Sequence, residues 1–274
     1  MKILPVVFIA AIENARVRKD RTMPESDTTR IQLCDIWEAV GLLTRLPAFG
    51  AGNRGVLAGW AWPLAGAIVA LIAGIIGSIA EAIGMPDPMT AVLVIMVMVI
   101  LTGAMHEDGL ADCADGFWGG WTPETRLEIM KDSRIGTYGV AALVLFLLFR
   151  WSAVVALLGT GTLIGPLIAT AALSRVPMLA LLRFMTCARS GGLSDKVGRP
   201  DSETLILAST LAMLLALLFS GFVALPAALL IIAVTWGAAL LSQAKIGGQT
   251  GDILGATQQL AEIAALAVFV SFLN

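Results

Sequence analysis

Long apolar runs constrain this chain more than any other feature, because a run of about 20 apolar residues is long enough to span a bilayer as an α-helix. Such spans are predicted near residues 57–80, 89–105, 140–159, 163–183, 204–222, 226–243 and 253–273. Only 14% of the residues are charged, whereas soluble domains carry roughly 25%. The sequence therefore predicts an all-α fold: a polytopic transmembrane helical bundle of about seven spans.

The first 50 residues differ from the rest. Residues 3–12 are apolar but too short to span, and a basic and polar stretch follows them. We expect residues 1–30 to form a poorly ordered cytoplasmic extension; an interfacial anchor is the alternative. Residues 31–50 mix apolar and charged side chains up to Pro47 and predict an interfacial helix. Residues 31–274 are expected to form one membrane-embedded catalytic domain.

The basic residues indicate the orientation. Of 18 Lys and Arg, eight precede the first span, three lie in 106–138, four lie in 183–199, and one is Lys245. The intervening turns near 81–88, 160–162 and 223–225 have none. Basic loops usually stay in the cytoplasm, so the N-terminus and the polar loops are predicted to be cytoplasmic.

Composition also excludes several classes of function. The net charge of −2 implies no nucleic-acid partner. Three cysteines without ligand spacing indicate no disulfide framework. With a single histidine, His106, a zinc centre or a histidine-based catalytic triad is not expected.

One polar segment, residues 106–139, carries seven of the twenty carboxylates. If its start is helical, Asp108, Asp112 and Asp115 share one helical face at positions i, i+4 and i+7. Adjacent carboxylates repel unless a cation neutralises them, and their hard oxygens suit Mg²⁺ or Mn²⁺. Glycines such as Gly109 favour a metal site over a solvated acidic loop, because they allow another group to approach the backbone closely.

Basic groups near these carboxylates suit a phosphate-bearing ligand. They are Arg126, Lys131 and Arg134, beside Asp132 and Ser133, and the loop residues Arg183, Arg189, Lys196 and Arg199. For the 183–199 loop, simple positive-inside topology is the alternative. Asp252 is predicted at the cytoplasmic start of the last span, near the positive end of the helix dipole.

Three charges, on Arg150, Arg175 and Glu262, fall inside predicted spans, where a charge is costly and needs a partner. They predict either an Arg–Glu pair that stabilises the bundle or a cavity wall that contacts an anionic substrate. Gln259 and Glu262 lie roughly on the same face of the last span as Asp252, which favours a polar interior.

These residues alone predict a metal-dependent phosphoryl or phosphodiester transferase at the cytoplasmic membrane face. A cation-coupled secondary transporter is the competing class. Two observations disfavour transport: the carboxylates cluster at the membrane edge rather than at the midplane, and the apolar segments show no inverted repeat.

Together the polar stretches resemble the cobalamin synthase family, also called adenosylcobinamide-GDP ribazoletransferases. The resembling stretches, in the family's order, are Leu43-Thr-Arg-Leu-Pro47, His106-Glu-Asp-Gly-Leu-Ala-Asp112, Ala114-Asp-Gly116, Met130-Lys-Asp-Ser-Arg-Ile-Gly-Thr-Tyr-Gly139 and Gly247-Gly-Gln-Thr-Gly-Asp-Ile-Leu-Gly-Ala256. The resemblance covers residues 31–274.

The resemblance implies an enzyme of late cobalamin biosynthesis in the bacterial inner membrane, dependent on Mg²⁺. In the implied reaction, the 3′-hydroxyl of α-ribazole, or of its 5′-phosphate, attacks the phosphoryl group of adenosylcobinamide-GDP, and GMP leaves. A homo-oligomer is a further expectation, because a single bundle of this size is too small to enclose a corrinoid.

The resemblance and the side-chain chemistry together suggest roles. Asp108, Asp112 and Asp115 are the metal-ligand candidates, and Glu107 is a fourth ligand or a neighbour of the ligands. The substrate-contact candidates are Lys131, Ser133, Arg134, Arg126 and Arg189. The catalytic candidates are Asp132, as a base or as an orienter of Lys131, Asp252, as a base or metal ligand, and His106, as a base or a solvated residue at a helix start.

A second enzyme family, the CDP-alcohol phosphotransferases, also uses a glycine-punctuated aspartate motif at a membrane face. That motif expects Ala-Arg after its first Asp-Gly. Here Leu-Ala-Asp follows Asp108-Gly109, and Phe-Trp-Gly-Gly follows Asp115-Gly116. The alternative therefore ranks second.

Overall fold

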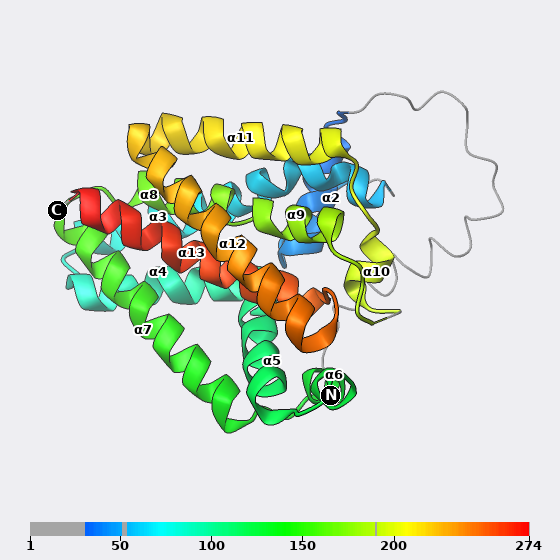
Figure 1. Ribbon diagram of the computed structural model, residues 1–274. Helices are drawn as coiled ribbons and strands as arrows, with labels where there is room; N and C mark the ends of the chain where they lie inside the picture. The colour runs from blue at the N-terminus through cyan, green and yellow to red at the C-terminus, as the bar shows by residue number, and fades with distance from the viewer. Residues whose placement is uncertain (1–30, 51–53, 190, 274) are drawn as a thin grey trace.

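The computed structural model describes residues 31–50, 54–189 and 191–273, and its regular elements are all helices (Figure 1). They are α2 (Cys34–Leu43), η1 (Gly55–Ala61), α3 (Trp62–Ala82), α4 (Asp87–Thr102), α5 (Met105–Gly119), α6 (Pro123–Lys131), α7 (Thr137–Gly159), α8 (Ile164–Leu173), α9 (Val176–Phe184), α10 (Leu193–Val197), α11 (Ser202–Ser220), η2 (Gly221–Val223), α12 (Ala224–Ile246) and α13 (Gly251–Leu273). The all-α prediction is confirmed. The predicted extension, residues 1–30, lies outside the described residues.

The apolar helices make this a multi-pass membrane protein, but the predicted number of seven spans is not confirmed. Within the described ranges, five helical segments are long and apolar enough to cross a membrane, or six if the bent pair α4–α5 counts as one span. One of the five, Ser202–Ile246, contains both α11 and α12, joined by η2.

The start of the acidic segment is helical: α5 begins at Met105, directly after the second predicted span, and runs through the first carboxylates. The chain bends by 88° between α4 and α5 (Figure 1). Two consecutive left-handed residues, Gly103 at φ 65° and Ala104 at φ 55°, make this bend. Glycine tolerates this conformation, whereas alanine adopts it rarely. The Arg45 side chain packs against Gly103, and its backbone N–H donates to Leu101 O at 2.6 Å.

The predicted span at 163–183 is also interrupted. Helix α8 ends at Leu173 and α9 begins at Val176. Pro177 lies at the start of α9, where its ring cannot donate a backbone hydrogen bond and conflicts with the carbonyl one turn earlier. The break leaves Ser174 and Arg175, both buried, in the middle of the bundle.

The predicted interfacial helix at 31–50 is shorter than expected and is tied to the bundle. Helix α2 ends at Leu43. Asp35 on this helix is fully buried; its carboxylate accepts from the Trp60 indole N–H at 2.7 Å and lies 2.8 Å from Arg54 Nε. Because a buried carboxylate needs such partners, α2 packs on η1 instead of lying free at the membrane surface.

Helix α13 is central to the bundle and packs against α5, α7, α8, α9 and α12 (Figure 1). Of the 18 most apolar consecutive residues of α13, 72% are buried, whereas only 22% of the corresponding residues of α7 are buried. The last helix therefore forms the core, and α7 and the α11–α12 segment present apolar surface outward.

Candidate active site

The site is built around the crossing of α5 and α13, where two glycines let the helices approach closely. A Cβ at Gly109 would lie 2.7 Å from Asp252 O, and a Cβ at Gly255 would lie 3.2 Å from His106 Cα. Small residues at such crossings are typical of membrane helices, because packing rather than hydrophobic burial drives their association. The pairing of residue 109 with 252 and of 106 with 255 also shows that the two helices run antiparallel here.

The crossing brings the backbone of Asp252 against the acidic part of α5. Asp108 and Asp112 lie on either side of Gly109 on α5, and Asp252 lies in the first turn of α13 opposite it. Asp108 is exposed, Asp112 is 9% exposed, and Asp252 is half-buried. The helix that a shared face of Asp108 and Asp112 requires is present, and Asp252 lies in the first turn of the last helix, as predicted. The structure thus joins two acidic stretches that are far apart in the sequence.

Arg189 is held beside these carboxylates by a short backbone pairing. Ala188 N donates to Gln249 O, and Gln249 N donates to Thr186 O, both at 2.8 Å. Gly248 permits this pairing, because a Cβ there would collide with Thr186 O. The Arg189 guanidinium lies 3.5 Å from an Asp252 carboxylate oxygen. One predicted substrate contact therefore adjoins one predicted catalytic residue.

Two polar atoms in this region lie buried without a hydrogen-bond partner in the described part of the chain. They are Arg189 Nη1 and Gln249 Oε1. A buried polar group without a partner is costly, so both atoms suit contact with a polar ligand. Gln249 is a candidate site residue that the sequence reasoning missed. Its place between glycines in the stretch 247–256 was the available signal.

Asp115 serves the start of α7. Its two carboxylate oxygens accept from Gly136 N at 2.7 Å and Gly139 N at 2.9 Å. Since these N–H groups have no partner inside α7, the carboxylate satisfies them and complements the positive end of the helix dipole. Asp115 thus shares a helix with Asp108 and Asp112 but is bound to a different element.

The second predicted group, on α6 and after it, has mixed roles. Arg126 donates to the carbonyls of Gly120 at 3.1 Å and Lys245 at 2.9 Å, which ties α6 to the end of α12. Lys131 and Ser133 are exposed.

Asp132 and Arg134 form an exposed pair, with 2.7 Å between Oδ2 and Nη2. The hydrogen bonds from Arg134 lower the pKa of Asp132. A carboxylate with a lowered pKa is a weaker base, so this geometry favours Asp132 as an orienter, with Arg134 rather than Lys131 as its partner.

Glu107 and His106 point into the bundle. Glu107 Oε1 lies 2.8 Å from Arg150 Nη1 and accepts from Gln259 Nε2 at 3.2 Å. Arg150 Nη2 also lies 2.9 Å from Glu262, which confirms the predicted Arg–Glu pair inside the spans. His106 is 1% exposed, so its alternative as a solvated residue at a helix start is wrong.

The carboxylate oxygens near the α5–α13 crossing are ligands of the kind that a hard cation such as Mg²⁺ prefers, with substrate phosphates as further ligands. In the described part of the chain, no three His, Cys, Asp or Glu side chains come together as a ready-made metal site. Magnesium is usually held by one or two carboxylates together with water and substrate phosphates. The carboxylates that could serve in this way are Asp108, Asp112 and Asp252 around the Gly109 crossing, and Arg189 could pair with a phosphate.

Comparisons with known proteins identify the family of this chain. Residues 35–270 match the family model of cobalamin-5-phosphate synthase. Proteins from Brucella ovis and Brucella canis, both named adenosylcobinamide-GDP ribazoletransferase, are each 47% identical over 214 residues, which cover 75% of this chain and 82% of the relative. No solved structure matches the chain.

Proposed function

Because the chain belongs to the cobalamin-5-phosphate synthase family, we propose that it is the transferase that joins adenosylcobinamide-GDP to α-ribazole, or to its 5′-phosphate. The products are adenosylcobalamin, or its 5′-phosphate, and GMP. The observation that carries this proposal is the match over residues 35–270, which spans every element of the α5–α13 site.

The α5–α13 crossing supports the chemistry. The bond that forms joins the ribazole 3′-oxygen to the phosphorus next to cobinamide, and the bond that breaks is the one from that phosphorus to GMP. Such displacements depend mainly on positioning and on neutralising phosphate charge. Asp108, Asp112 and Asp252 would hold Mg²⁺, with Mn²⁺ as the alternative. The bound cation would neutralise charge on the pyrophosphate and on departing GMP.

The chain's own residues supply the remaining functions. Arg189, with its buried Nη1, would bind a phosphate oxygen and orient it toward the α5–α13 crossing. The GDP part of the substrate would be bound by the exposed residues Lys131, Ser133 and Arg134. Asp252 is our candidate base toward the ribazole hydroxyl if it does not hold the cation. Asp115 would keep α7 in position.

Location and assembly are part of the proposal. The family and its bacterial relatives support a location in the bacterial inner membrane. The alternation of basic and non-basic loops supports an active site at the cytoplasmic face. A homo-oligomer remains a prediction, which light scattering on the detergent-purified protein would check.

The test is transfer activity in liposomes that contain the purified protein, with both substrates and with Mg²⁺ or excess chelator. We expect GMP and the cobalamin product only with Mg²⁺, and a loss of at least about 100-fold in Asp112→Asn. Glu128→Gln, which changes an exposed carboxylate on α6, is the matched control and should keep full activity. No product from folded wild-type protein would refute the transferase, whereas an unaffected Asp112→Asn variant would refute only this metal site.

A further inference from the structure

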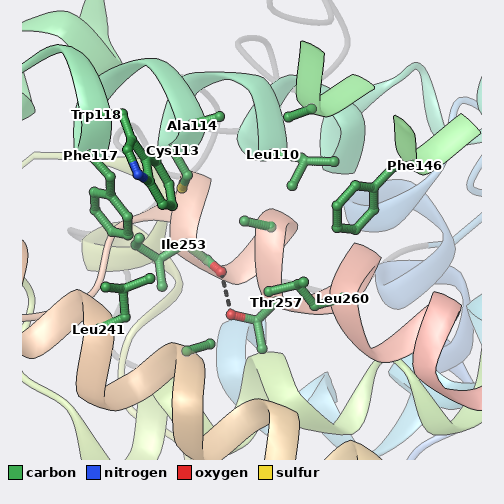
Figure 2. Close-up of a pocket in the computed structure, with 13 residues that line it drawn as sticks. Leu110, Cys113, Ala114, Phe117, Trp118, Phe146, Leu241, Ile253, Thr257 and Leu260 are labelled. Carbon is green, nitrogen blue, oxygen red and sulfur yellow. Dashed lines mark hydrogen bonds between the residues drawn. The ribbon is translucent and has the colours of Figure 1, made fainter. Parts of the chain in front are cut away.

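An apolar cavity of about 250 Å³ lies between α5, α7, α12 and α13 (Figure 2). Large side chains line it, among them Leu110, Phe117, Trp118, Phe146, Leu241 and Leu260. No charged side chain lines it, and the Thr257 hydroxyl donates to the Ile253 carbonyl at 2.7 Å. Because the lining offers water few partners, this cavity suits an apolar group.

The cavity is distinct from the candidate active site. On α5 it is lined by Leu110, Cys113 and Phe117, at positions i, i+3 and i+7. At about 100° per residue, this face is directed roughly opposite to the face of Asp108 and Asp112. A ligand in the cavity would therefore be separated from Asp108 and Asp112 by the body of α5.

The two outer helices that line the cavity face the membrane. Helices α7 and α12 line opposite sides of it and have at most slight contact with each other. The most apolar 18 residues of α7 are only 22% buried, and those of the segment that joins α11 and α12 are only 17% buried. On α12 itself, exposed apolar side chains include Leu229, Ile232, Trp236 and Leu240. The cavity is thus bordered by surfaces that lie in hydrocarbon, from which an acyl chain can enter.

A cation lies at the rim of the cavity. Lys245 Nζ donates to the Phe117 carbonyl at 3.4 Å and lies 6.0 Å from the centre of the Trp118 ring. Lys245 makes no ion pair with a carboxylate of the described residues. Arg126 adjoins it, since its guanidinium donates to the Lys245 carbonyl. Apolar lining, an interfacial tryptophan and two neighbouring cations together complement an anionic amphiphile.

We propose that this cavity holds an acyl chain of an anionic phospholipid, whose headgroup is bound by Lys245 and Arg126. The cavity supplies the apolar contact, and the two cations supply the preference for negative charge. The proposal does not depend on the transfer reaction. Because α5 and α13 form the wall of the cavity, a bound lipid would also support the crossing that carries the carboxylates.

The test uses the full chain in phosphatidylcholine liposomes that contain a trace of phosphatidylglycerol with a diazirine on its acyl chain. After illumination, mass spectrometry maps the labelled residues. We expect labelling to centre on the cavity, and unlabelled phosphatidylglycerol to compete about 30-fold better than phosphatidylcholine, as two neighbouring cations predict. Lys245→Gln should reduce this preference to about fivefold, because Arg126 remains. Lys196→Gln, at an exposed position of helix α10, should leave it unchanged.

A second pair of variants tests the cavity itself. Ala142→Phe places a ring in it and should abolish labelling there, whereas Ala141→Phe, at an exposed neighbouring position outside the lining, should not. Helix content measured by circular dichroism controls for folding. Even labelling along α7 and α12, or equal competition by the two lipids, would overturn the proposal. Displacement by adenosylcobinamide-GDP or α-ribazole would assign the cavity to substrate, and cross-linked dimers would assign it to a second copy; both would overturn it.

Discussion

At the scale of single residues, both oxygens of the Asp115 carboxylate accept hydrogen bonds from the first turn of α7. Removing it in Asp115→Ala leaves Gly136 N and Gly139 N without their acceptors, and Gly139 is buried. We expect a loss of about 2 kcal/mol in the free energy of unfolding, because charge-assisted bonds at a helix start are lost. Thermal unfolding in detergent, followed by circular dichroism, measures this.

The matched variant Asp115→Asn keeps one acceptor oxygen but no charge, so it should lose less stability than Asp115→Ala. The two variants separate a structural role from metal binding. If Asp115→Ala were as stable as the wild type and inactive only for want of Mg²⁺, Asp115 would be a metal ligand and this account of α7 would be wrong.

At the scale of elements, the glycine crossing of α5 and α13 sets the position of the carboxylates. In Gly109→Ala, the new methyl would lie 2.7 Å from Asp252 O, a backbone atom, so α13 must shift. We expect a loss of transfer activity of at least about tenfold, because small displacements of positioning groups are costly. Gly237→Ala on α12 is the matched control, since nothing lies within 4 Å of its Cβ.

The control should raise stability by about 0.5–1 kcal/mol, because glycine weakens a helix relative to alanine. Activity of each variant is measured as GMP release, and unfolding is measured alongside it. A Gly109→Ala protein with normal activity would show that the spacing of α5 and α13 does not position the site.

At this scale, the sequence could predict only features that neighbouring residues determine. Helical periodicity placed Asp108 and Asp112 on one face, and hydropathy located α13 with Asp252 in its first turn. The turn at Gly103–Ala104 was not predictable, because Ala104 rarely adopts a left-handed conformation and depends on surrounding packing. Contacts between distant residues, such as that of Arg126 with the carbonyl of Lys245, leave no periodic signal.

At the scale of the whole molecule, one buried ion network joins the helices around the core. Arg150 on α7 contacts Glu107 on α5 and Glu262 on α13, and Arg175, at the α8–α9 break, lies 3.7 Å from Glu262. The charges of the two arginines and the two glutamates cancel. This cancellation matters for stability, because a buried charge without a partner is far more costly than a buried pair.

Removing one member should therefore destabilise the whole bundle. In Arg150→Met, Glu107 and Glu262 share only Arg175, and we expect a loss of about 3–5 kcal/mol in the free energy of unfolding. The double variant Arg150→Met with Glu107→Gln restores the balance and should recover part of that loss. Unfolding in mixed detergent micelles, followed by circular dichroism, measures both variants. The single variant Glu107→Gln is measured alongside them. If the loss in the double variant equalled the sum of the losses in Arg150→Met and Glu107→Gln, the network would not act as a unit, and packing of α13 alone would hold the helices together.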